Sequence, residues 1–171
     1  TSSIIGNTFN GGDFQGYMLW QQAHGANIRV NFRLRKNASH HVQLQGSVTL
    51  TKNQWHHIVV TYDGSGDNTG LKMYTNGSEM AGTRTGTLSQ DIDWTAIDIP
   101  FNIGARMNSN LQYNGLIDEV SVFNSELSAA NVTTIYNSGV PNDISSLSPL
   151  SWWRFEEGSG TTVIDSGTGG N

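Results

Sequence analysis

Cysteine is absent from the 171 residues, and charged side chains make up only 13% of them. The lack of cysteine excludes disulfides, thiolate metal sites and cysteine nucleophiles. No apolar run reaches membrane-spanning length, so we expect no insertion into a membrane. Proline occurs three times and glycine 20 times, while Asn, Ser and Thr supply most of the polarity. This composition favours many short strands joined by turns and argues against a helical bundle.

The few charges are unevenly distributed along the chain. The net charge of −5 argues against nucleic acid as a partner. Residues 1–60, however, hold one acidic group, Asp13, against five basic groups: Arg29, Arg33, Arg35, Lys36 and Lys52. The rest of the chain holds four basic and thirteen acidic groups. Positive charge is therefore concentrated in the first part of the chain.

Residues 28–35 alternate apolar and polar side chains with a period of two, which is typical of a half-buried strand. The side chains expected to face the core are Ile28, Val30, Phe32 and Leu34. Those expected on the opposite face are Arg29, Asn31, Arg33 and Arg35. Further strand patterns occur at residues 42–50, 55–62, 71–75, 100–104, 116–123, 152–155 and 161–164.

Two local signals mark a turn and a helix. Asn76-Gly77 is the strongest hairpin signal in the chain. Ser128 is a good helix N-cap, and the segment after it closes at Gly139 and Pro141. The side chains expected on one face of this helix are Val132, Ile135 and Tyr136, with Leu127 packing on Val132 as a hydrophobic staple. The sequence therefore predicts many strands and one short helix.

Three segments carry a family pattern in their order and spacing. They are Trp55-His-His-Ile-Val-Val-Thr-Tyr-Asp63, Leu71-Lys-Met-Tyr-Thr-Asn-Gly77, and Phe101-Asn-Ile-Gly104 leading to Tyr113-Asn-Gly-Leu-Ile-Asp-Glu-Val-Ser-Val-Phe123. With the helix that follows, they resemble laminin-G-like modules of the concanavalin A-like lectin and glucanase superfamily over residues 55–139. The resemblance implies an all-β fold, an antiparallel β-sandwich of the jelly-roll type with one short helix.

The resemblance also implies an unusual organisation of the chain. Residues 150–171 look like the opening of such a module, although they follow its closing helix, and the first strands expected of a module are missing from the front. We expect a laminin-G-like sandwich at residues 1–143, a Ser-rich linker at 144–149 and a tail at 150–171. The tail either opens the next module of a tandem array or supplies the missing strands to its own module or to a neighbour. Because an incomplete sandwich exposes strand edges that pair with other chains, we expect a homo-oligomer or a tandem array.

A structural calcium ion is implied by the same resemblance. In the family, the Asp of the Ile-Asp-Glu strand and the Asp of the opening Asp-Ser-Gly motif often share one ion. These positions are Asp118 and Asp165 here, with Asn171 or loop carbonyls as further ligands. Calcium prefers such oxygen ligands. The alternative is that Asp118 caps a turn and Asp165 is solvated.

A basic strand face is the first candidate for ligand binding. Arg29 and Arg33, with their neighbours on the same face, suit acidic glycans because a guanidinium makes charge-assisted hydrogen bonds with carboxylate or sulfate. The alternative is a face that is solvated or paired in salt bridges.

Aromatic side chains are the second candidate, because lectin-like modules stack sugar rings on them. Trp94, Tyr113 and Trp20 lie among turn-rich neighbours. Asp91 and Asp93, next to Trp94, would accept hydrogen bonds from sugar hydroxyls. The alternative is that these aromatic rings belong to the core.

Catalysis is not indicated. Glucanases of the superfamily use a Glu-x-Asp-x-x-Glu strand, whose carboxylates act as nucleophile and as acid or base, and no such strand is present. Asp118 and Glu119 are adjacent and would point to opposite faces of a strand. No Ser-His-Asp pattern, phosphate loop or dinucleotide fingerprint occurs. We therefore expect a protein that is not an enzyme.

Two functions follow as expectations. The first is a non-catalytic module for carbohydrate binding or adhesion, whose partner is a glycan. The second is a structural display subunit, such as a virion fibre, a decoration protein or a surface-filament subunit, which assembles with neighbouring copies by strand exchange. In both cases we expect the protein outside the cell, on a cell surface or on a virion.

Overall fold

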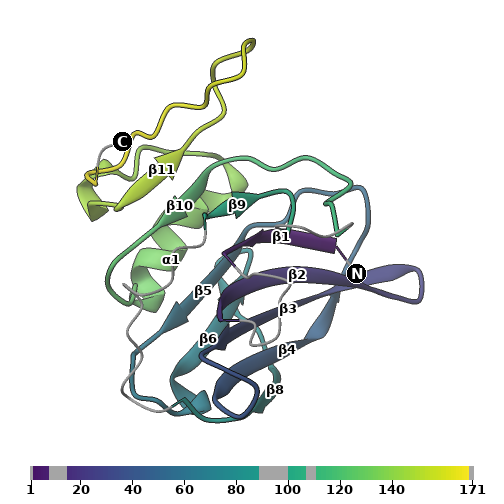
Figure 1. Ribbon diagram of the computed structural model, residues 1–171. Coiled ribbons are helices and arrows are strands. Elements are labelled where there is room, and N and C mark those ends of the chain that lie inside the picture. The colour runs from purple at the N-terminus through teal and green to yellow at the C-terminus, as the bar shows by residue number, and fades with distance from the viewer. Residues whose placement is uncertain (1, 8–14, 89–99, 107–110, 170–171) are drawn as a thin grey trace.

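The computed structural model describes residues 2–7, 15–88, 100–106 and 111–169, and its largest element is a six-stranded antiparallel sheet (Figure 1). The strands lie in the order β8-β4-β3-β2-β1-β9. Their bounds are β1 Ser2–Gly6, β2 Gly16–His24, β3 Asn27–Arg35, β4 His41–Leu50, β8 Gly82–Thr85 and β9 Asn102–Ile103. In the centre, β2, β3 and β4 form a meander, in which each strand pairs with the next one along the chain.

A second, three-stranded sheet consists of β5 Ile58–Tyr62, β6 Leu71–Thr75 and β7 Ser78–Glu79. Asn76 and Gly77 connect β6 to β7 with φ angles of 48° and 78°. Two successive positive φ angles are what the favoured two-residue hairpin turn requires, so the hairpin predicted from Asn-Gly is confirmed. A third sheet pairs β10 Val120–Val122 with β11 Ser151–Trp153. The short 3₁₀ turns are η1 Asn68–Gly70, η3 Asn137–Gly139 and η4 Ser145–Leu147.

The main core lies between the six-stranded and the three-stranded sheets. Its buried members from the two sheets include Leu19, Val30, Phe32, Val42, Leu44, Leu71 and Met73. Each such side chain, removed from water, contributes about 2 kcal/mol to stability. The apolar side of β3 is the predicted one, because Ile28, Val30, Phe32 and Leu34 all pack in this core. The antiparallel β-sandwich of the predicted class is thereby confirmed.

The helix α1 Ala129–Tyr136 covers the other face of the three-stranded sheet. Ser128 accepts a hydrogen bond from the backbone N–H of Asn131 and so caps the helix as predicted. Leu127 and Val132 belong to one cluster with Tyr74 of β6, with Val59 and Ile135 packed beside it. The predicted staple therefore also anchors the helix to the sheet.

The tail pairs with β10 and then leaves the body of the molecule. In β11, Trp152 lies opposite Ser121, and Trp153 opposite Val120. Residues 154–164, which we call the arm, project away from the sandwich, and the chain returns at the Trp153–Asp165 bridge (Figure 1). The ring of Trp153 stacks on Phe101, with centroids 5.2 Å apart. In this structure the tail therefore packs against the body of its own chain.

Several predicted strands differ from those observed. Residues 161–164 were expected to form a strand, but they form none, and their side chains are exposed. Of residues 116–123 only Val120–Val122 form a strand. The arm has no strand beside it in the described residues, so β-branched residues alone do not produce one.

Among the described residues, no helix has both the length and the hydropathy that a membrane-spanning helix requires.

Candidate functional site

The outward side of the six-stranded sheet is its polar face. In antiparallel pairs, residues directly opposite each other share a face, so the register aligns Met18, Arg33, Gln43 and Thr85 in one row. The next row holds Ser3, Trp20, Asn31, Gln45 and Thr83. Further positions of the polar face include Gln22, His24, Asn27, Arg29, Arg35, His41 and Thr49. These described positions include no Asp or Glu.

A cluster of positive charge lies at one end of the polar face. Arg33 and Arg35 both belong to β3, and Arg106, which follows β9, comes near them. Burial lowers the pKa of Arg33, and the charges of Arg35 and Arg106 lower it further. Burial and the charge of Arg35 also lower the pKa of Arg106. Sequence reasoning missed Arg106, because it is far from β3 along the chain and only the folded chain brings it near Arg33 and Arg35.

His41 extends the cluster at its edge. It lies opposite Arg35 in the β3–β4 register. Burial lowers the pKa of His41, and the charges of Arg33 and Arg35 lower it further. His41 is therefore neutral at pH 7, so the positive charge of the cluster comes from its arginines.

Trp20 and Arg33 are in direct contact on the polar face. The Cζ atom of Arg33 lies 5.7 Å from the centroid of the Trp20 ring, which is a cation–π arrangement. Both side chains are half-buried. Arg29, the other predicted basic residue, lies beyond Asn31 on the same strand and contacts His24, with Nη2 and Nε2 2.8 Å apart. The structure thus brings Trp20, Arg29 and Arg33 onto one face.

The centre of the polar face contains a buried amide without hydrogen bonds. Asn31 is completely buried, and within the described residues neither Oδ1 nor Nδ2 has a hydrogen-bond partner. The hydroxyl of Ser3, which is 1% exposed, also lacks a partner in this part of the chain. A buried polar group without a hydrogen bond costs about 1–3 kcal/mol. Such groups are uncommon in proteins and need an explanation, such as a bound water or ligand.

The predicted calcium ligands are both engaged in backbone contacts. Asp165 Oδ1 accepts hydrogen bonds from the N–H groups of Trp152 (2.7 Å) and Gly167 (2.8 Å). Burial opposes the charged form of Asp165, but these bonds and one from Ser151 outweigh it, so its pKa lies below the usual value. Asp118 is exposed, and its Oδ1 accepts a bond from the N–H of Glu119. A cation would use the second oxygen of each carboxylate.

Several other predicted residues do not join this surface. Asn171, Trp94, Asp91 and Asp93 lie outside the described residues. Tyr113 is half-buried, its N–H donates to the carbonyl of Gly104 at 2.7 Å, and its ring lies against Gly115. Within the described part of the chain, no three His, Cys, Asp or Glu residues form a group that could hold a metal ion.

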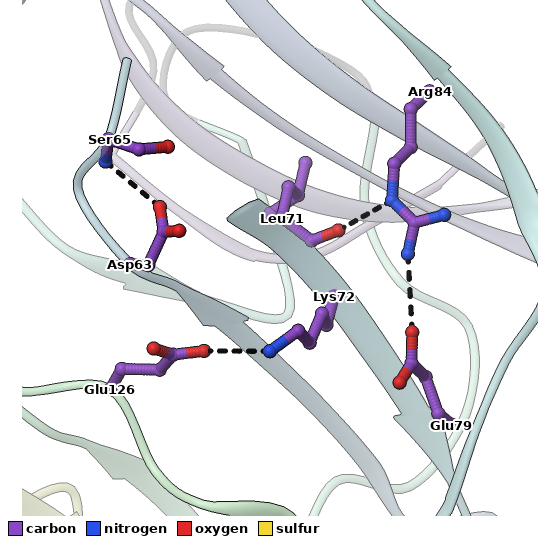
Figure 2. Close-up of polar contacts among 7 residues, drawn as sticks. All are labelled: Asp63, Ser65, Leu71, Lys72, Glu79, Arg84 and Glu126. Carbon is purple, nitrogen blue, oxygen red and sulfur yellow. Dashed lines mark hydrogen bonds and ion pairs between the residues drawn. The ribbon is translucent and has the colours of Figure 1, made fainter. Parts of the chain in front are cut away.

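Polar contacts around β6 link the second sheet to β8 of the first sheet and to the segment before α1 (Figure 2). Lys72 pairs with Glu126 at 3.3 Å and links β6 to the segment before α1. Arg84 donates from Nε to the carbonyl of Leu71 at 2.8 Å and pairs with Glu79 at 3.3 Å. In each contact both groups belong to the protein, so the contacts support the fold and we assign them no role in ligand binding.

A shallow groove of about 530 Å³ lies on the helix side of the molecule. It runs between the β6–β7 turn and the end of α1, and its lining is Asn76, Gly77, Ser78, Thr133, Thr134, Tyr136, Asn137, Ser138 and Asn142. The turn and the helix end were each predictable, but their meeting was not, because it depends on how α1 packs across the sheet.

Comparison with known families gives one match. Residues 1–133 match a laminin-G family model described as the concanavalin A-like lectin/glucanases superfamily. No curated protein matches the chain.

Proposed function

Because the chain belongs to the concanavalin A-like lectin/glucanases superfamily, we propose that it is a non-catalytic module that binds carbohydrate on its polar face. We place it outside the cell, on a cell surface or on a virion, where glycans are accessible. The observation that carries the proposal is the composition of this face. It presents an aromatic ring, Trp20, among amide, hydroxyl and guanidinium groups.

The chemistry of the face suits sugars. A sugar ring has an apolar side that packs on an aromatic ring and hydroxyls that exchange hydrogen bonds with amides. Gln43 and Gln45 supply such amides on β4, opposite Arg33 and Asn31. A few polar groups around an aromatic platform are a common arrangement in ligand sites.

The same face supports binding without hydrolysis. Glycoside hydrolysis generally requires two carboxylates, one on each side of the scissile bond. The described strand positions of the polar face carry neither Asp nor Glu. A bound saccharide would therefore leave unchanged.

Saccharide binding by the whole chain tests this proposal. We expect the protein to retain a subset of saccharides on a glycan array, and Trp20→Ala to weaken that binding about tenfold through loss of ring packing. Trp55→Ala is the matched control, because Trp55 is 65% exposed and lies outside the polar face. The proposal fails if no saccharide binds, or if the two variants weaken binding equally.

A second candidate is a display subunit that assembles with copies of itself. The arm favours it, because Val163 and Ile164, which precede the Trp153–Asp165 bridge, are 37% and 62% exposed. Exposed apolar side chains on a projecting segment suit contact with another chain. The state of assembly distinguishes this candidate from the first.

A further inference from the structure

The cationic cluster on the polar face is opposite in sign to the net charge of the whole molecule. The protein carries a net charge of −5, yet burial lowers the pKa of Arg33, and the nearby charges of Arg35 and Arg106 lower it further. Keeping like charges together costs free energy unless an opposite charge compensates them. Arg35 and Arg106 have additional contacts of their own, so Arg33 is the candidate anion-binding residue.

Arg33 has a free hydrogen-bonding capacity. Its guanidinium lies against the ring of Trp20 and, within the described residues, forms no ion pair. Packing on an aromatic face leaves the N–H groups at the edge of the guanidinium plane to donate. Those donors match the two oxygens of a carboxylate or sulfate in a bidentate arrangement. Arg33 is therefore positioned to bind an anion.

The groups around Arg33 are neutral and polar. Gln43 lies opposite it on β4, and Thr85 continues the row on β8. On the neighbouring row, Gln45 of β4 lies opposite Asn31, which in turn lies directly opposite Trp20 of β2. An anion-binding arginine beside an aromatic ring and the half-buried amides of Gln43 and Gln45 matches a ligand that has both a charged group and hydroxyls.

We infer that the polar face binds an acidic saccharide, whose carboxylate or sulfate is held by Arg33 in the field of Arg35 and Arg106 while its ring packs on Trp20. This inference rests on the proposed function and names the class of its ligand.

Matched pairs of saccharides test the inference on the full chain. One pair is an oligogalacturonate and its methyl ester, which differ only in the charge of the carboxyl groups. The other pair is dextran sulfate and dextran. Inorganic polyphosphate serves as an anion without sugar rings. Calorimetric titration measures each affinity at low and at physiological salt, because an interaction of this kind weakens as salt rises.

Three variants distinguish a specific contact of Arg33 from a general effect of charge. Arg33→Gln removes the bidentate contact and should weaken binding of the acidic saccharide by about tenfold or more. Lys72→Gln removes one positive charge from β6, outside the polar face, and should leave binding unchanged. Arg33→Lys keeps the charge without the planar fork and should restore only part of the affinity. Circular dichroism verifies that each variant is folded.

The outcomes are distinct. Tighter binding of an acidic member than of its neutral counterpart, with a loss in Arg33→Gln, a smaller loss in Arg33→Lys and none in Lys72→Gln, supports the inference. Binding of the neutral members with no preference for the acidic ones overturns the inference and leaves the proposed function standing. If polyphosphate binds as tightly as the acidic saccharides, sugar rings are not required, and the part of the inference that names a saccharide is overturned. Binding of no saccharide at all overturns both.

Discussion

At the scale of single residues, Glu119 links the tail to the body of the protein. Its Oε2 accepts a hydrogen bond from Nε1 of Trp152 at 2.6 Å, and its Oε1 lies 3.6 Å from Nε of Arg154. Arg154 in turn lies over the ring of Trp152, with Cζ 4.9 Å from the centroid. The backbone of Glu119 has φ of 51°, a left-handed conformation that costs a residue with a side chain about 1–2 kcal/mol. The contacts with the tail offset this strain.

Removal of the Glu119 carboxylate should destabilise the protein. Trp152 is 4% exposed, so Glu119→Ala leaves a buried N–H without an acceptor and should lower the free energy of unfolding by about 1–3 kcal/mol. Glu119→Gln keeps an acceptor and should cost less. Urea unfolding followed by tryptophan fluorescence measures both.

Glu126→Gln is the control for that experiment. It breaks the exposed pair with Lys72 and should cost less than about 1 kcal/mol. Equal losses in Glu119→Ala and Glu126→Gln would show that the Trp152 contact contributes little.

Asp165 should make stability depend on pH. Its pKa in the folded protein is lowered, so the charged form stabilises the fold above the pKa of the unfolded chain, about 3.9. That contribution is lost as the pH falls through the lower, folded pKa. Asp165→Asn keeps an oxygen acceptor but not the charge, and the loss of stability between pH 5 and about pH 3 should become smaller.

Asp143→Asn serves as the comparison. Asp143 accepts a hydrogen bond from the N–H of Ser145 and its pKa is also lowered by it, but the carboxylate is fully exposed and screened by water. Urea midpoints at the two pH values should change more for Asp165→Asn. Identical pH dependences in both variants would contradict the role given to Asp165.

At the scale of elements, the β6–β7 hairpin and α1 support each other. A Cβ atom added to Gly77 would lie 2.8 Å from Cδ1 of Tyr136. His57, whose N–H donates to Asn76, stacks on the same tyrosine ring with centroids 5.6 Å apart. The turn thus needs glycine for its φ and also for the close approach of the helix.

A comparison of two glycines with nearly equal φ distinguishes the requirement for a positive φ from the requirement for close packing. Gly77 and Gly64 have φ of 78° and 76°, but a Cβ at Gly64 would contact nothing within 4 Å. Gly64→Ala should cost about 1–2 kcal/mol from the left-handed backbone alone. Gly77→Ala should cost more, because Tyr136 must also move. Thermal unfolding measures the difference, and equal losses would mean that α1 adjusts freely.

At the scale of the whole molecule, three layers are stacked: the six-stranded sheet, the three-stranded sheet and α1. The main core fills the first interface, and the cluster around Val132 fills the second. The tail attaches at one end through β10, Phe101 and Glu119. The half-buried side chains of the polar face, such as Trp20 and Arg33, and the exposed arm remain within reach of other molecules.

Light scattering and thermal unfolding, each with calcium present and again after chelation, test the state of assembly. The lectin-like function predicts a monomer whose melting temperature falls when calcium is removed, because an ion shared by Asp118 and Asp165 would tie the tail to the segment before β10. Asp118→Asn should abolish the calcium response without disturbing the backbone contacts of Asp165. A melting temperature independent of calcium would reject the ion. A concentration-dependent oligomer would favour the display function over the lectin-like one.

The features of this protein that depend on local sequence patterns could be predicted without the structure. The alternation in residues 28–35 placed both faces of β3 correctly, and Ser128 and Asn76-Gly77 marked the helix start and the hairpin. These signals work because the two-residue period, the cap and the turn each depend on neighbours along the chain. The family pattern likewise indicated the sandwich.

Which groups far apart in the sequence come into contact depends on the tertiary structure. It brought Arg106 near Arg33, buried Asn31 without a hydrogen bond and paired the tail with β10. It also left residues 161–164 outside any strand. The physical reason is that strand partners and crossings are chosen by the packing of the whole core, while a side chain's own sequence neighbours specify only which face of its element it occupies.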